Sequence, residues 1–159
     1  MSLRKYLLII LVISIIVLSG CKAGKRAAIQ AKYEAKEQAK LEQAKIFQEA
    51  IETSNPSKCQ ELSGSTASIN CITRIAYDKR DSNTCSLIPG ELYKDFCSII
   101  VTGEILECDA KSLDKFGLGD VHKASCRSII NEDKTECDIF EQGKTNYNIC
   151  LSNYNNIFS

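Results

Sequence analysis

Eight cysteines spread over residues 59–150 constrain the fold of this chain more than any other feature. They stand at positions 59, 71, 85, 97, 108, 126, 137 and 150, after a ninth at position 21. Taken alternately, they form one series that advances by 26, 23 and 29 residues and another that advances by 26, 29 and 24. A period of about 26 residues predicts four structural units with two cysteines each.

The residues around the cysteines repeat as well. Four positions before the first cysteine of each unit stand Asn55, Asp81, Glu104 and Asp133, and all but Glu104 are good helix N-caps. Apolar residues recur three positions after the first cysteine, except at Lys111, and four positions after the second: Leu62, Ile88 and Phe140, then Ile75, Val101, Ile130 and Tyr154.

Helix-breaking residues separate the two halves of each unit, so each unit is predicted to be a short helix, a turn and a longer helix. The breakers are Ser63-Gly64-Ser65, Pro89-Gly90, Phe116-Gly117-Leu118-Gly119 and Gly143.

Eight cysteines allow 105 pairings. If the two helices of a unit fold back on each other, its cysteines reach the Cα separation of ~5.5 Å that a disulfide needs. The predicted disulfides are therefore Cys59–Cys71, Cys85–Cys97, Cys108–Cys126 and Cys137–Cys150. The rival scheme joins each second cysteine to the next unit, as Cys71 to Cys85, and leaves Cys59 and Cys150 at opposite ends of the array.

Metal binding and redox catalysis are less favoured uses of these cysteines, because the nearest two are 11 positions apart and there is no C-x-x-C motif. A calcium site is the minor alternative for the acidic cluster Glu132, Asp133, Glu136 and Asp138, which does not follow an EF-hand register and is better explained as a solvated helix start.

His122, the single histidine, is expected to face solvent at a helix start, with no nucleophile assigned to it. Gly117-Leu118-Gly119 is expected to be a turn, because it lacks the third glycine of a nucleotide-binding loop. We expect neither an enzyme nor a bound cofactor or metal.

Residues 25–53 favour helix, since they are rich in Ala, Lys, Glu and Gln and contain no Gly or Pro. As far as Lys40 the segment is expected to be a solvated stalk, with a coiled coil as the alternative. Beyond Leu41 an apolar face is expected to pack on the cysteine-rich domain, before Ser54-Asn55-Pro56 ends the helix. That face consists of Ala44, Phe47 and Ile51, flanked by Ile46 and Ala50.

The N-terminus carries a short positive segment and an apolar run. Arg4 and Lys5 precede Leu7–Leu18, whose 12 residues would cover about 18 Å of a ~30 Å hydrocarbon core. The run closes on Leu18-Ser19-Gly20-Cys21, which resembles the lipobox of bacterial-type lipoproteins. The resemblance implies that residues 1–20 are a cleaved signal peptide and that Cys21 carries a diacylglyceryl group, with acyl chains such as palmitate. An uncleaved signal anchor starting near Tyr6 is the alternative.

Lipidation of Cys21 would leave eight cysteines to pair, as in an exported protein in an oxidising compartment. The 20 basic and 20 acidic residues balance, so charge gives no reason to expect a nucleic-acid partner. Residues 22–45 hold seven basic and three acidic side chains, whereas 11 basic and 17 acidic residues follow. The basic part therefore lies next to the expected lipid, where anionic headgroups would attract it.

Cysteine-bearing helix pairs from Asn55 to about Tyr154 resemble repeats of uncharacterised exported proteins and lipoproteins of archaea and bacteria. We expect an all-α protein with a signal peptide (1–20), a lipid-anchored helical stalk (21–53) and a cysteine-rich domain (54–159). The domain is expected to be about four disulfide-stapled helical hairpins in a short solenoid-like array.

The leading functional hypothesis is a structural or protein-interaction role on the extracytoplasmic side of the cell membrane or outer membrane. The membrane, reached through lipidated Cys21, and another envelope or surface protein are the expected partners. The alternative is a small-ligand-binding lipoprotein with a pocket between hairpins. A pocket lined by apolar and a few convergent polar groups would favour the ligand, and a broad exposed face would favour the protein partner.

Overall fold

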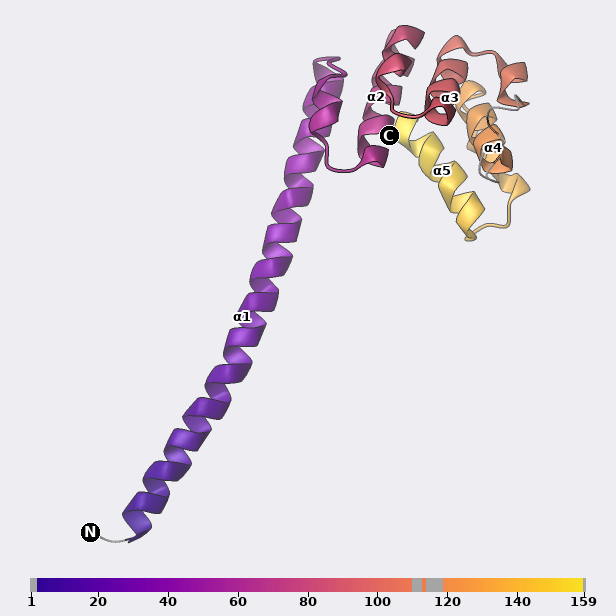
Figure 1. The fold of residues 1–159 in the computed structure, drawn as a ribbon. Helices are drawn as coiled ribbons and strands as arrows, with labels where there is room; N and C mark the ends of the chain where they lie inside the picture. Colours follow the sequence, from indigo (N-terminus) through magenta and orange to yellow (C-terminus); the bar gives the residue numbers. More distant parts are fainter. Residues whose placement is uncertain (1–2, 110–112, 114–118, 159) are drawn as a thin grey trace. The chain divides into compact units, whose positions relative to one another are not determined.

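The described part of the chain is helical throughout and contains no strand (Figure 1). The structure, a computed structural model, describes the backbone of residues 3–109, 113 and 119–158, and their side chains from Ala28 onward. In chain order the elements are α1 (Leu3–Glu52), η1 (Lys58–Glu61), α2 (Ser65–Lys79), η2 (Ser82–Leu87), α3 (Glu91–Thr102), η3 (Ile105–Asp109), α4 (Gly119–Ile130), η5 (Lys134–Ile139) and α5 (Thr145–Phe158).

The chain divides into two compact units, Met1–Glu42 and Gln43–Ser159. The last turns of α1 belong to the second unit because their apolar face is packed: Ala50 is fully buried, and Phe47 and Ile51 are partly buried against the core. Ala44, expected on the same face, is exposed. The buried stripe runs through 43, 46, 47, 50 and 51, and position 44 lies off it.

Four disulfides staple the second unit, one in each repeat. Their Cα–Cα distances are 5.6 to 5.7 Å, and all eight cysteines are buried. Each joins a short helix to the α-helix that follows it, with the same pairs that the spacing predicts: Cys59–Cys71, Cys85–Cys97, Cys108–Cys126 and Cys137–Cys150.

The short helix of each repeat is a 3₁₀-helix. Runs of four to six residues gain too few bonds to nucleate an α-helix, which explains the tighter form. Asp81 and Asp133 cap η2 and η5 by accepting hydrogen bonds from the backbone N–H of Asn83 and Thr135, at 3.0 and 2.9 Å. The side-chain oxygen of Asn55 accepts from Ser57 N–H in the same way, at 3.1 Å.

The backbone conformation before each repeat is the same in all four repeats, although the side chains there differ. Immediately before each cap position stands a residue with positive φ: Ser54 (49°), Arg80 (53°), Gly103 (75°) and Glu132 (53°). At three of these sites the next N–H reaches back five residues, as in Asp81 N to Ala76 O (3.0 Å), which is the Schellman way of ending a helix. A glycine also stands seven residues before the second cysteine of every unit: Gly64, Gly90, Gly119 and Gly143.

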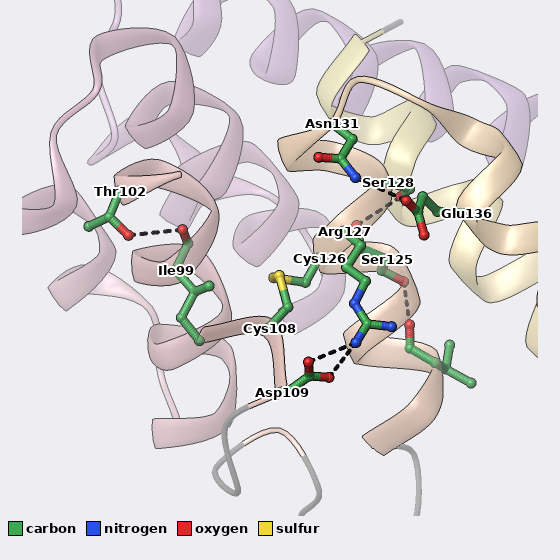
Figure 2. The surroundings of a disulfide bond; sticks show 11 residues. Ile99, Thr102, Cys108, Asp109, Ser125, Cys126, Arg127, Ser128, Asn131 and Glu136 are labelled. Atoms are coloured by element: carbon green, nitrogen blue, oxygen red, sulfur yellow. Dashed lines mark hydrogen bonds and ion pairs between the residues drawn. A yellow bond between two sulfur atoms is a disulfide. The ribbon is translucent and has the colours of Figure 1, made fainter. Parts of the chain in front are cut away.

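The third repeat differs from the others, as its unusual residues suggest. Its cysteines are 18 residues apart instead of 12 or 13. Lys111 lies outside the described residues, and Leu113 is the fully buried side chain of that segment. Beside the disulfide, Nη2 of Arg127 donates to both carboxylate oxygens of Asp109, at 2.6 and 2.7 Å, and this ion pair adds a second link between η3 and α4 (Figure 2).

The α-helices of the repeats form a closed circuit. Successive helices contact each other, α2 with α3, α3 with α4 and α4 with α5, and α5 also returns to contact α2. At this junction the rings of Tyr77 and Phe158 meet edge to face with centroids 5.8 Å apart, and the Arg74 guanidinium donates to the Ile157 carbonyl. The end of α5 accordingly lies beside α2 (Figure 1). In an open array the two end repeats would not touch.

Candidate functional site

A cavity of about 270 Å³ lies between the four α-helices of the repeats. Every helix of the circuit contributes to its wall, so the return of α5 to α2 creates it. The volume is just below the ~300–1,000 Å³ of pockets that take drug-sized ligands. The cavity therefore suits a small molecule. Its lining is Ser65, Thr66, Ile69, Asn70 and Thr73 of α2, Tyr93 and Phe96 of α3, His122 and Ile129 of α4, and Ile149, Asn153, Asn156 and Ile157 of α5.

Neutral polar side chains on α2 and α5 form one part of the wall. On α2 they are spaced so that Thr66, Asn70 and Thr73 share one helical face, and Asn153 and Asn156 are similarly close on α5. Thr73 is only 5% exposed, yet no described residue is hydrogen-bonded to its hydroxyl. Because no described side-chain N or O atom is both fully buried and unpartnered, this hydroxyl must reach the cavity surface.

Aromatic rings from α3 and α4 form another part of the wall. The His122 ring lies edge to face with Tyr93 and Phe96, with centroids 6.4 and 6.0 Å apart. His122 is 7% exposed, so the expectation that it faces solvent is wrong. The reason is its register on α4: it lies four residues before the buried Cys126 and seven before Ile129, on the inward face of the helix.

None of the described residues that line the cavity is an Asp, Glu, Lys or Arg. Outside the cavity, the described carboxylates with a shifted pKa are Asp81, Asp133 and Glu49. The pKa of Asp81 is lowered mainly by its hydrogen bond from Thr84, and that of Asp133 by its backbone hydrogen bond from Thr135. The pKa of Glu49 is lowered by its hydrogen bond and ion pair with Lys58. These groups stabilise helix ends rather than a binding site.

A shallower groove continues from the cavity along α2 and α5. It shares Thr66, Asn70, Ile149, Asn153 and Asn156 with the cavity wall and extends past Asn148 and Ser152. The groove is again lined by amides and hydroxyls, so the polar wall runs outward from the cavity.

Two members of the acidic cluster have hydrogen-bond partners within the fold. Asp133 caps η5, and Glu136 accepts a hydrogen bond from Asn131 at 2.9 Å (Figure 2). Among the described residues, no group of three or more His, Cys, Asp or Glu is arranged to hold a metal ion.

Two of the motifs fall partly or wholly outside what the structure describes. Of Gly117-Leu118-Gly119, only Gly119 is described, as the first residue of α4. The expected signal peptide and lipidation site Cys21 lie where side chains are not described. As far as its residues are described, no helix has the length and apolarity needed to cross a membrane.

Sequence reasoning missed the polar wall, although its signal is present. On α5, Ile149, Asn153 and Asn156 recur at intervals of four and three, which places them on one face of the helix. Amides at such positions look like an ordinary solvated face until the helix is known to pack against α2.

Comparisons with known proteins returned nothing similar to this chain: no family model matches it, and no curated protein or solved structure does.

Proposed function

We propose that this protein is a lipid-anchored, extracytoplasmic binding protein that takes a small ligand into the cavity between its four repeats. The observation that carries the proposal is the lining of the cavity, in which aliphatic and aromatic side chains are combined with a few convergent hydroxyls and amides. This is the criterion that separates the ligand hypothesis from the protein-partner hypothesis. No catalytic role is proposed.

The anchoring part of the proposal rests on the sequence. Leu18-Ser19-Gly20-Cys21 resembles a lipobox, and lipidation of Cys21 leaves eight cysteines, the number that the four disulfides use. Two acyl chains on one cysteine give stable membrane attachment where a single chain is marginal. The protein would therefore act at the outer surface of a cell membrane or at an outer membrane.

Cys21→Ser tests the anchor. The variant is expected to lose labelling by a fatty-acid tracer and to remain an unprocessed precursor or leave the membrane. The eight other cysteines pair with one another, so the melting temperature of the folded domain should stay unchanged. Labelling of the variant at the wild-type level would rule out lipidation at this cysteine.

Blocking the cavity tests ligand binding. Thr66 is exposed at the rim, so Thr66→Trp should obstruct the cavity without disturbing the core. Thr102→Trp is the matched control, because Thr102 is exposed on α3 away from the cavity. In a thermal-shift screen of a diverse small-molecule library, the full chain and the control are expected to share ligands that the Thr66 variant does not bind. If all three give the same response, the cavity is not the binding site.

A protein-interaction role is the second candidate, favoured by exposed apolar residues on the 3₁₀-helices. Leu106 on η3 is 86% exposed and lies two residues before its cysteine. Leu87 on η2 and Ile139 on η5 are also exposed, and each lies two residues after its cysteine. Replacing Leu106 and Ile139 by serine would weaken a protein contact and leave the small-ligand screen unchanged.

A further inference from the structure

We infer that the ligand of the cavity is an uncharged saccharide, with one sugar ring inside the cavity and a second ring along the groove between α2 and α5. This inference rests on the proposed function, since it names the chemical class that the same site would take. Three properties of the described lining support it: it contains no Asp, Glu, Lys or Arg, several of its polar side chains have no hydrogen-bond partner among the described residues, and one side of it is aromatic.

The absence of carboxylate, ammonium and guanidinium groups from the described lining disfavours most ionic ligands. A buried charge is costly unless an opposite charge or several hydrogen bonds compensate it. The described lining offers hydroxyls, amides, apolar side chains and one imidazole, but no carboxylate, ammonium or guanidinium. The site therefore favours a neutral molecule over a phosphate, a uronic acid or an ammonium compound.

The polar groups are placed for a ligand with many hydrogen-bonding positions. No described residue is hydrogen-bonded to the side chains of Thr73, Asn70 or Asn156. Asn153 donates one N–H to Ser125 Oγ at 3.1 Å, which orients its amide and keeps its Oδ1 for another donor. A hydroxyl both donates and accepts, so a polyhydroxylated ring satisfies amides and hydroxyls alike. An alkyl chain would leave these groups unpaired and is disfavoured.

The aromatic side of the cavity suits the apolar faces of a sugar ring. A saccharide ring carries its hydroxyls around its edge and exposes C–H groups on its faces. Those faces are apolar and pack well on aromatic rings, which bring a large apolar area with few rotatable bonds. Tyr93 and Phe96 provide such rings, and their edge-to-face contacts with His122 hold the three side chains together.

The groove supports a ligand with more than one sugar ring. The cavity and the groove share five lining residues, so a ligand can extend from one into the other and stay in contact with polar side chains along its length. The groove adds Asn148, Ser152 and Thr145 and contains a single aliphatic residue, Ile149. We therefore expect a disaccharide to bind more tightly than either of its monosaccharides.

The test is a binding panel measured on the full chain in detergent by isothermal titration calorimetry. It comprises neutral mono- and disaccharides (glucose, galactose, N-acetylglucosamine, maltose, cellobiose, lactose and chitobiose), matched uronic acids, nucleosides and a straight-chain fatty acid. At least one neutral disaccharide is expected to bind, at least tenfold more tightly than its acidic counterpart and more tightly than its component sugars.

Paired variants place the ligand in the cavity. Asn156→Leu and Asn70→Leu should each weaken binding by about three- to tenfold, the loss of one hydrogen bond. Asn155→Leu is the matched control, because this neighbouring asparagine lies outside the cavity lining. The Asn155→Leu variant should bind the saccharide as tightly as the wild type. Thr73→Val should weaken binding while raising the melting temperature without ligand, since it removes a buried hydroxyl that no described residue satisfies. A merely structural threonine would not show that combination.

The outcomes separate this inference from the proposed function. If a nucleoside, a uronic acid or a fatty acid binds best and Thr66→Trp abolishes that binding, the saccharide assignment is overturned while the ligand-binding role stands. If no compound of the panel binds, the saccharide assignment also fails, and the cavity-blocking screen decides the broader role. Loss of saccharide binding in Asn155→Leu to the same extent as in Asn156→Leu would contradict the placement of the ligand.

Discussion

At the scale of residues, the repeat is visible in the backbone conformation of single residues at the helix ends. Each repeat begins after a residue with positive φ, but glycine occupies this position only at Gly103. Ser54, Arg80 and Glu132 adopt the same left-handed conformation at a cost, because a Cβ atom is disfavoured there. After Arg80 and Glu132, the capping residues Asp81 and Asp133 then start the next 3₁₀-helix.

Glu132→Gly should therefore stabilise the domain by up to about 1 kcal/mol, because glycine adopts positive φ without a steric penalty. Among the described residues, Glu132 is bonded to another helix through its carbonyl, which accepts from Tyr154 Oη and is retained in the variant. Gly103→Ala at the equivalent site should destabilise by about 1 kcal/mol. Urea unfolding of both variants measures the two changes, and changes of the same sign would refute the repeat-based explanation.

The capping aspartates should make stability depend on acid pH. The lowered pKa of Asp81 means that its contribution to stability is present above its unfolded pKa and is lost as the pH falls through the folded value. Asp81→Asn should thus be less stable than the wild type at pH 7, and the difference should shrink below about pH 4. Glu104→Gln serves as the control, since no described residue is hydrogen-bonded to the Glu104 side chain. Thermal unfolding between pH 2.5 and 7 gives both profiles; a constant difference across this range would contradict the capping role.

At the scale of elements, each disulfide joins a short 3₁₀-helix to the longer helix that follows it. The 3₁₀-helices have four to six residues and could not hold their place by local bonds alone. Disulfides that close loops of this length contribute about 3 kcal/mol each in the chain-entropy model. They matter in a domain whose core is built from isoleucines, cysteines and a few other side chains, with no Trp in the sequence.

Removing one disulfide should lower the melting temperature strongly. The double variant Cys85→Ala, Cys97→Ala is expected to lose ~3 kcal/mol of unfolding free energy. In a domain of this size, such a loss lowers the melting temperature by roughly 10 °C or more. Non-reducing digestion with mass spectrometry should recover the other three within-repeat pairs from this variant. A dominant peptide joining Cys71 to Cys85 in the wild type would instead support the rival connectivity.

At the scale of the whole molecule, the cysteine spacing predicts far more of the fold than of the site. The repeat, the helical class and the cap positions follow from local patterns, because helices and their ends are encoded within a few residues. The contact between α2 and α5 does not, since Tyr77 and Phe158 are far apart in sequence and look like ordinary helix residues. The cavity depends on that contact, and so the roles of Asn70, Asn156 and His122 become visible only in the folded chain.

The contact between Tyr77 and Phe158 offers the most direct test of the closed circuit. In a nuclear Overhauser experiment on the isotopically labelled full chain, the ring protons of the two residues are expected to show cross-peaks, because their centroids lie 5.8 Å apart at an interplanar angle of 82°. Cross-peaks between α4 and α5, which are in contact in any arrangement of successive repeats, provide the internal control. Clear control peaks with no peak between the Tyr77 and Phe158 rings would show that the array is open, and the cavity between the four helices would not exist.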